Sequence, residues 1–487
     1  MEARILILLF ILFLFSILFV FGFKKNKRST GRVPPGSMGL PFIGQSLEVI
    51  KALKYDKIDE WFKERIRKYG PVSKANLFGY PTVVLHGPAA NKFIYSTCDG
   101  NELANAHPPS VSRLFGERNI LELHGDEHKR IRTAVIPFLR VDILKQSVAK
   151  IEEEIQYHFR THWHGKHEVH AQSLMKILSF NSSCTLLFGI ERGARREKFQ
   201  PHLHEMMESL LSVPINLPFT QFYRGIKARE KLLPIVVDLM NEKKMILAEQ
   251  KQQGLENAQT DLITSLLSVC DDNNGSTMST EEIVDNSIAL MFAGYGTTAV
   301  LLTFLIRILA TNESIYSSVF KEHEEIAKSK STGEALTWED IIKMKYTWKV
   351  ASEILRVYTP VNVTFRRALE DIEYGGYIIP KGWQVMLTPS MTHMDESIFQ
   401  NPPKIDPGRF EKHAPSLPAF SYVPFGSGPR ICPGIEFVKM ESLVMIHHLV
   451  REFKLELVNK DEPFKRIPFP EFENRLLVRI QPITKTK

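Results

Sequence analysis

Residues 425–434 read Phe-Gly-Ser-Gly-Pro-Arg-Ile-Cys-Pro-Gly, and this stretch decides both the fold and the chemistry that the sequence predicts. Three glycines and two prolines favour a compact loop over a helix or a strand. Cys432 stands near the end of this loop, and a helix is predicted to begin just after Gly434. A helix N-terminus lowers the pKa of a nearby thiol and favours the thiolate. A lone thiolate in such a loop suits the soft axial ligand of a heme iron.

Two other residues of the loop have expected roles at such a site. Gly434 would let the backbone approach the sulfur, and Arg430 could pair with a heme propionate. The alternative is a buried structural cysteine in a turn. Cys98, Cys184 and Cys270 stay unassigned, because four cysteines in 487 residues are too few for a disulfide scaffold.

The loop resembles the heme-binding signature of the cytochrome P450 superfamily, Phe-x-x-Gly-x-Arg-x-Cys-x-Gly, and matches it at every fixed position. The resemblance implies a heme-thiolate monooxygenase that carries heme b, with Cys432 as the axial thiolate on the iron. It also implies heme contacts from Phe425, Arg430 and Gly434. The implied fold is mainly α with minor β, one large helical domain with small sheets, preceded by an N-terminal transmembrane helix.

A second motif of the family follows the expected order along the chain. Glu353-x-x-Arg356 places opposite charges three residues apart, where they meet on one helix face. Arg409 completes the family's structural triad, and the resemblance implies that the triad braces the segment before the cysteine loop. The Glu-x-x-Arg pattern alone carries little weight, because Glu127-x-x-Arg130 matches it as well.

Three basic residues occupy places where the family binds the heme propionates. His128 and Arg132 stand on the first helix beside the heme, and Arg366 comes much later in the chain. The resemblance implies that each of the three reaches a propionate. The alternative for each is a charge in contact with solvent.

Residues 293–298 read Ala-Gly-Tyr-Gly-Thr-Thr inside a long apolar helix that begins at a capping box, Ser279 with Glu282. Glycine and threonine are poor choices for a helix interior. A functional kink would explain them, since glycine opens room over the heme and a threonine hydroxyl hydrogen-bonds dioxygen or water. The alternative is a close helix crossing lined by glycine.

The resemblance makes Thr297 the threonine on the oxygen side, followed by Thr298, but Gly296 stands where the family has Asp or Glu. That acid helps to relay protons. Without this acid, the proton could come through water that passes Gly296, from the substrate or from another side chain. The alternative functions are a heme-thiolate isomerase or a heme-binding protein with little turnover. If slow proton delivery through water uncouples the use of electrons from product formation, Gly296→Asp should raise the product formed per NADPH.

Hydrophobic periodicity predicts a mostly helical chain between residues 126 and about 312, with polar loops at 249–259 and 271–280. A hairpin is predicted over residues 72–85, with its turn at Gly79-Tyr80-Pro81. The remaining predicted elements are helices at 58–68, at 345–358 and after 434, and strands at 363–368, 377–379, 384–387 and 476–480.

Residues 5–23 form an apolar stretch that is interrupted only by Ser16 and Gly22. As a helix it would run roughly 28 Å, about the thickness of the hydrocarbon core of a bilayer. A cleaved signal peptide is the alternative, although no small-x-small cleavage site precedes Lys24. The basic residues after the stretch place the large C-terminal part in the cytosol. We therefore expect a membrane anchor at 1–28, a basic, proline-rich hinge at 29–44 and a catalytic domain at 45–487.

The net charge of +7 lies mainly in this N-terminal part. Residues 1–36 hold six basic residues and one acidic residue, a net +5, which leaves +2 for the rest of the chain. A body so close to neutral offers no electrostatic case for nucleic acid.

Residues 34–44 and the pattern Gly125-x-x-His128-Lys129-x-x-Arg132 resemble the plant branch that oxidises steroids, triterpenoids and diterpenoids. This implies a lipophilic substrate, dioxygen, an NADPH-cytochrome reductase and a single-pass anchor in the endoplasmic reticulum membrane. The apolar segment 210–219 could dip into the membrane, and a small core beneath a loop is the alternative. Pocket residues are expected at 110–121, 210–219, 290–293 and 360–363.

Overall fold

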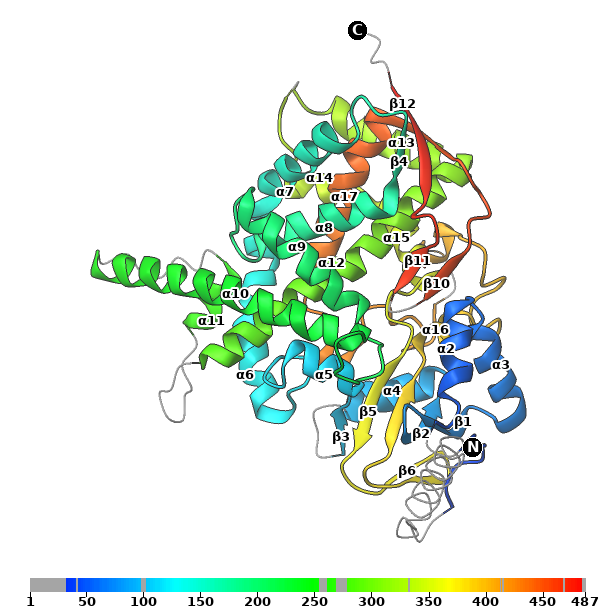
Figure 1. Cartoon of the computed structure of the whole chain (residues 1–487). Coiled ribbons are helices and arrows are strands. Elements are labelled where there is room, and N and C mark those ends of the chain that lie inside the picture. Colours follow the sequence, from blue (N-terminus) through cyan, green and yellow to red (C-terminus); the bar gives the residue numbers. More distant parts are fainter. Residues whose placement is uncertain are drawn as a thin grey trace, which may run out of the picture.

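The computed structural model describes residues 32–40, 43–97, 102–253, 261–268, 278–331, 333–411, 413, 416–466 and 469–483. The predicted anchor at 1–28, together with Cys98 and Cys270, lies outside these residues. Helices make up most of the body, and the strands gather toward one side of it (Figure 1). The predicted fold class, mainly α with small sheets, is confirmed.

The core of the helical part is α12 (Thr280–Thr311), which contacts α8, α10, α13, α15 and α17. Its predicted capping box is present, since Ser279 Oγ accepts from the Glu282 N–H and the Glu282 carboxylate accepts from the Ser279 N–H. Among the described residues, α12 is the one helix long and apolar enough to cross a membrane, but most of its apolar part is buried inside the protein. The other helices are α2 (Ser46–Lys54), α3 (Ile58–Tyr69), α4 (Pro88–Thr97), α5 (Pro109–Phe115), α6 (Gly125–Val135), α7 (Val141–His162), α8 (Ala171–Leu186), α9 (Ala194–Glu208), α10 (Gln221–Gln252), α11 (Leu262–Leu267), α13 (Glu313–Lys328), α14 (Trp338–Ile341), α15 (Lys345–Val357), α16 (Pro389–His393) and α17 (Ile435–Glu452).

The larger sheet has five strands in the order β1-β2-β8-β5-β3, and a second sheet has the order β4-β12-β9. All pairs are antiparallel except β2 with β8, a parallel pair that the long helical excursion between these strands makes possible. The strands are β1 (Val72–Leu77), β2 (Tyr80–Leu85), β3 (Leu103–Asn105), β4 (Glu168–His170), β5 (Thr364–Ala368), β6 (Ile372–Tyr374), β7 (Tyr377–Ile379), β8 (Gln384–Leu387), β9 (Phe453–Leu457), β10 (Phe464–Arg466), β11 (Pro470–Phe472) and β12 (Leu477–Pro482).

Two local predictions were wrong. The hairpin turn lies at Phe78 and Gly79, not at residues 79–81, because both adopt positive φ, 55° and 84°, as a two-residue type I′ turn requires. The predicted loop at 249–259 begins inside a helix, since α10 continues to Gln252. Glutamate, glutamine and lysine are good helix formers, so a polar run need not be a loop.

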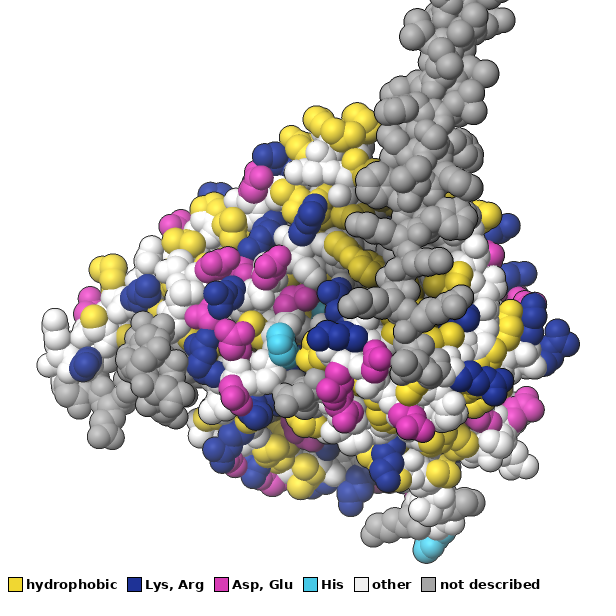
Figure 2. Space-filling view, turned by 90° about the horizontal axis from the view of Figure 1, so that it is seen from below, with side chains coloured by type: hydrophobic (Ala, Val, Ile, Leu, Met, Phe, Trp, Pro, Cys, Tyr) yellow, Lys and Arg dark blue, Asp and Glu magenta, His cyan; other side chains and the backbone are white. Residues whose placement is uncertain are grey.

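The described part of the proline-rich hinge lies against the body. Lys74 N–H donates to Pro35 O at 2.8 Å, and Ile378 N–H donates to Arg32 O at 3.0 Å. Figure 2 shows a face on which apolar side chains gather near the upper edge, while basic and acidic side chains are mixed over the rest. That mixture agrees with a body of low net charge.

Candidate active site

The cysteine loop is a compact turn that leads into α17, as the sequence predicts. Gly426 and Gly428 have φ of +71° and +68°, where a side chain would be strained. A Cβ at Gly428 would lie 2.2 Å from the carbonyl oxygen of Tyr95, so this loop can reach α4 only with glycine there. The Cys432 N–H donates to Phe425 O at 2.9 Å and closes the loop.

The surroundings of the Cys432 sulfur have opposing effects on the pKa of its thiol. Burial raises the pKa of the thiol, whereas the Gly434 backbone N–H and the positive charge of Arg132 lower it. Gly434 has a negative φ of −89°, and a Cβ there would stand 3.8 Å from the sulfur, which is ordinary contact. The contribution of this residue to the sulfur is therefore its N–H group.

Two of the predicted heme contacts, Arg132 and Arg430, join the cysteine loop to α6 and to the segment before it. Arg132 Nη2 donates to Ile431 O at 2.7 Å, which joins α6 to the cysteine loop. Arg430 reaches the segment before α6, where it donates to Leu123 O at 2.5 Å and to Ile120 O at 3.4 Å. His128 is buried on the same helix as Arg132.

Arg366 approaches the same segment from the sheet. It is buried on β5 and pairs with Asn105 of β3. The Asn105 side chain donates to Leu121 O at 2.7 Å. Asn105, the strand partner of Arg366, therefore reaches the same stretch, residues 120–123, to which Arg430 donates.

This set of donors fits a heme. Cys432 supplies a soft sulfur donor, and the guanidinium groups suit two propionate carboxylates. Ala293 and Thr297 lie one turn apart on α12 and are partly accessible, although most of that helix is buried. Cys432 is partly accessible as well. The thiol and one face of α12 thus stay open in an otherwise closed core.

The predicted Glu-Arg-Arg triad is assembled. Glu353 and Arg356 are fully buried and form a two-pronged ion pair with N–O distances of 2.7 and 2.9 Å. Arg409 Nε reaches the same carboxylate at 3.3 Å, and the Asp406 N–H donates to it at 2.9 Å. Arg409 also donates to Gln400 O at 2.6 Å, so the triad holds the segment that precedes the cysteine loop.

The competing Glu-x-x-Arg match does not form a comparable pair. Arg130 pairs with Glu282 of α12, and Glu127 lies 3.5 Å from Arg118 at the surface.

The sequence did not reveal the residue that connects the triad to the cysteine loop, which is His393. Arg356 Nη1 donates to His393 O at 2.9 Å, and the Val423 N–H donates to His393 Nε2 at 3.0 Å. Burial lowers the pKa of His393 to about 3, so its ring is neutral and Nε2 can accept. Val423 O accepts from the Gly426 N–H at 3.0 Å, which completes the connection. A lone histidine at the end of a short helix gives no sequence signal of this role.

The glycines of α12 are points of close approach. A Cβ at Gly294 would lie 2.8 Å from Ser183 Oγ of α8, and one at Gly296 would lie 2.6 Å from the Phe469 ring and 2.7 Å from Met207. The helix is continuous through this stretch, which favours the predicted alternative of a close crossing. Phe469 and Met207 also obstruct the direct water path past Gly296 that the sequence suggested.

The two threonines of this stretch differ in their surroundings. The Thr297 hydroxyl donates to Ala293 O at 2.7 Å on the partly accessible face of the helix. Thr298 is fully buried. The two side chains therefore lie on different faces of α12.

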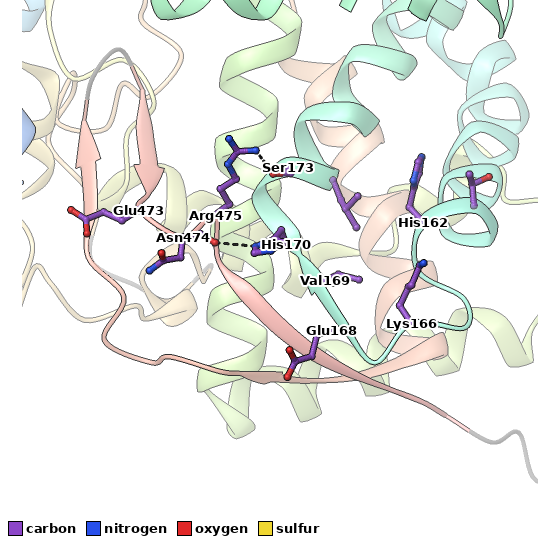
Figure 3. A pocket seen from close by; sticks show the side chains of 11 residues that line it. His162, Lys166, Glu168, Val169, His170, Ser173, Glu473, Asn474 and Arg475 are labelled. Atoms are coloured by element: carbon purple, nitrogen blue, oxygen red, sulfur yellow. Dashed lines mark hydrogen bonds between the residues drawn. The ribbon is translucent and has the colours of Figure 1, made fainter. Parts of the chain in front are cut away.

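A surface hollow of about 610 Å³ lies apart from these residues, between α7, α8, β4 and the turn before β12 (Figure 3). His162, Lys166 and His170 line it, and Arg475 donates to Ser173 at 3.4 Å across it. Its lining includes none of the predicted site residues, so we assign it no part in the heme site.

Comparison with known proteins agrees with this geometry. The cytochrome P450 family profile matches residues 34–484. Taxane 10-beta-hydroxylase of Taxus cuspidata is 36% identical over 456 residues, covering 93% of this chain and 90% of that protein. Beta-amyrin 28-monooxygenase of Medicago truncatula is 35% identical over 479 residues, covering 98% of each. The structure of a retinoic acid-bound cyanobacterial CYP120A1 matches with a TM-score of 0.82 and 27% identity, covering 93% of this chain and 100% of that one. This chain belongs to the cytochrome P450 family of monooxygenases, whose cofactor is heme b with a cysteine thiolate on the iron.

Proposed function

We propose that this protein is a membrane-anchored monooxygenase that hydroxylates or further oxidises a lipophilic terpenoid or steroid. Dioxygen is the oxidant, and an NADPH-cytochrome reductase supplies the electrons. The observation that carries the substrate class is the likeness, over 88% or more of the chain, to hydroxylases of taxanes and monooxygenases of beta-amyrin. Both substrate groups are polycyclic terpenoids.

Cys432 is the proposed axial ligand, and its thiolate would be stabilised by the Gly434 N–H and by Arg132. Arg430, Arg132, His128 and Arg366 would hold the two propionates. When bound, the heme supplies oxygen activation: one atom of dioxygen enters a C–H bond of the substrate and the other leaves as water, with two electrons and two protons consumed. Phe425 holds the loop through its carbonyl, which accepts from the Cys432 N–H.

Aromatic side chains support an apolar substrate. Phe115 of α5 lies 4.5 Å from Phe292 of α12, measured between ring centroids, and Phe292 lies 5.8 Å from Phe469. Two of these rings belong to segments expected to form the pocket, residues 110–121 and 290–293. A wall of this kind favours a hydrocarbon skeleton over a polar substrate.

Exposed apolar side chains support the membrane assignment. Between α9 and α10, Val213 and Phe219 are 65% and 83% exposed, and Ile215 and Leu217 are about half exposed. Such side chains are costly in water and would be stabilised at a bilayer surface. With an anchor at 1–28, this loop would touch the endoplasmic reticulum membrane while the domain at 45–487 stays in the cytosol.

The test is NADPH-driven turnover of the full-length protein in membranes with a plant reductase. Substrates are a taxane precursor, beta-amyrin and a sterol, with Cys432→Ser as the control. We expect an oxygenated product from at least one substrate and none from Cys432→Ser. Full turnover by Cys432→Ser would overturn the mechanism, and no product from any terpenoid or sterol would overturn the substrate class.

A further inference from the structure

Arg466 is a buried arginine at the end of β10, and its side chain joins separate parts of the chain. Its Nε donates to Asp56 Oδ1 at 2.5 Å, and its Nη2 lies 3.4 Å from Asp59 Oδ2. Its Nη1 donates to Asn362 Oδ1 at 3.3 Å. Each nitrogen of the guanidinium group therefore faces a different partner, which the rigid fork of an arginine allows and the single amine of a lysine does not.

The three partners come from elements that are far from β10 in sequence. Asp56 lies in the turn between α2 and α3, Asp59 belongs to the first turn of α3, and Asn362 follows α15. Figure 1 shows α2 next to β10, and the two elements are in contact. The Arg466 side chain is 8% exposed, so water cannot take the place of these partners. One buried side chain thus fixes the positions of these elements relative to one another.

The strands β10 and β11 also place an aromatic ring against α12. Their antiparallel register sets Arg466 opposite Pro470, the residue directly after Phe469. The Phe469 ring fills the space beside Gly296 and lies 5.8 Å from the Phe292 ring, measured between centroids. The contacts of Arg466 are therefore made at the end of β10 that lies next to this ring.

These two strands need anchors, because each is three residues long and an isolated pair of strands is marginally stable at best. The Phe464 ring packs against an aromatic ring of α12 at the start of β10, with 5.5 Å between the centroids. The Phe472 N–H donates to Gln172 Oε1 of α8 at 2.8 Å at the end of β11. Both contacts are made at the end away from Phe469. Arg466 anchors the end that carries it.

We propose that Arg466 is a positioning residue that determines substrate specificity. Through Asp56 and Asn362 it would fix two walls of the substrate pocket together, the Phe469 ring and the segment 360–363. The spacing of these walls would decide which polycyclic skeletons fit, although Arg466 itself does not contact the substrate. This inference rests on the proposed function, because it concerns the pocket for the proposed terpenoid or steroid.

The first test compares two imidazole ligands of different size on the full-length heme-loaded protein. Nitrogen binding to the iron shifts the main visible absorption band, so both dissociation constants are measured without turnover. Imidazole itself is too small to need the pocket walls, whereas clotrimazole carries three phenyl rings that must fit between them. A loose wall has to be ordered when a ligand binds, so we expect Arg466→Gln to raise the Kd of clotrimazole about tenfold and that of imidazole less than about twofold.

The conservative variant Arg466→Lys keeps the charge but can reach fewer partners, so its Kd for clotrimazole should lie between those of the wild type and Arg466→Gln. An unchanged or lower Kd for clotrimazole in Arg466→Gln would overturn the proposal. So would an equal rise in the Kd of imidazole, because that would indicate damage to the heme site and not to the walls.

A double variant separates a positioning role from a general loss of stability. If Arg466 acts through the Phe469 ring, its replacement should have little effect once that ring is gone. We expect Arg466→Gln to raise the Kd of clotrimazole about threefold or less in the Phe469→Ala protein, because the effects of coupled residues do not add. Equal effects with and without the ring would overturn the proposal.

The matched control is Lys465→Gln, which removes the same charge from the neighbouring residue of β10. The Lys465 side chain is 46% exposed and lies 3.8 Å from Glu471, on the other face of the strand. We expect a Kd for clotrimazole within about twofold of the wild type, as for a surface ion pair. If Lys465→Gln matched the effect of Arg466→Gln, charge on β10 and not the anchor would be responsible, and the proposal would be wrong.

A milder variant covers the case in which Arg466→Gln fails to fold. Asp56 has a φ of +53°, which asparagine also tolerates, so Asp56→Asn changes the charge and little else. It should raise the Kd of clotrimazole about threefold, although it lies in the turn between α2 and α3. The control is Asp142→Asn, which removes the partner of Arg140 in an exposed pair. Equal Kd values for these two variants would overturn the proposal.

Turnover gives the last reading, with beta-amyrin and a taxane precursor as substrates and a plant reductase as electron donor. The relative amounts of the oxygenated products should change in Arg466→Gln. Unchanged relative amounts with a lower total would indicate lost stability alone and would overturn the proposal. A wild type that oxidises neither substrate would count against the proposed function alone, because the clotrimazole results stand independently.

Discussion

Replacing Glu353 by glutamine should lower the free energy of unfolding by more than the loss of one charge would suggest. Glu353 accepts from Arg356 through both oxygens, from Arg409 and from the Asp406 N–H. Glutamine has the same shape but only one acceptor oxygen and no charge. Arg356 would then keep two carbonyl partners, His393 O and Lys404 O, and no carboxylate.

The expected cost follows from burial. Both Glu353 and Arg356 are 0% exposed, so the remaining guanidinium charge could not be solvated by water. Leaving one member of a buried ion pair alone costs about 3–5 kcal/mol. Total folding free energies are about 5–15 kcal/mol, so the variant would lose a large part of its stability. Because the triad leads through His393 to the cysteine loop, heme retention should fall as well.

Urea-induced unfolding followed by circular dichroism measures the stability, and the reduced carbon-monoxide spectrum measures intact thiolate ligation. The matched control is Glu411→Gln, which removes the partner of Lys349 in a partly exposed pair. Pairs of that kind contribute about 1 kcal/mol or less. If Glu353→Gln and Glu411→Gln had equal effects, the triad would not be the brace that its geometry indicates.

Three further outcomes are expected. Gly428→Ala should prevent heme loading, because its methyl group would lie 2.2 Å from a carbonyl oxygen of α4, and a full-height reduced carbon-monoxide spectrum would contradict this. Gly296→Asp should lower the product formed per NADPH, contrary to the expectation from sequence, because the new Cβ would lie 2.6 Å from the Phe469 ring. The double variant with Phe469→Ala should recover part of this loss. Burial alone would lower the pKa of His448, but hydrogen bonds to carboxylates of α7 and α17 raise it above its usual value. The stability that His448 adds is therefore present below about pH 6.5 and lost as the pH rises through the raised pKa. His448→Gln should destabilise most at about pH 5.5 and least at about pH 8 in urea titrations, and a difference independent of pH would refute this.

Much of this organisation could be predicted because the informative residues are neighbours in sequence. The cysteine loop, the Ser279 capping box and most helix and strand positions depend on local patterns, and the structure shows each of them. His393 escaped prediction because its role depends on elements that meet only in the folded chain. The same holds for Gly296, whose neighbour Phe469 is far away in sequence.

The position of the Phe469 ring explains why residue 296 is glycine and not an acid. An aspartate there would need the space that the Phe469 ring occupies, and that ring continues the aromatic wall through Phe292. The packed aromatic rings and an acid side chain therefore exclude each other on this side of α12. Smaller residues at 469 should therefore change which substrate is oxidised. If Phe469→Ala changed only the fraction of NADPH that yields product, and left the choice of substrate unchanged, the Phe469 ring would not contact the substrate.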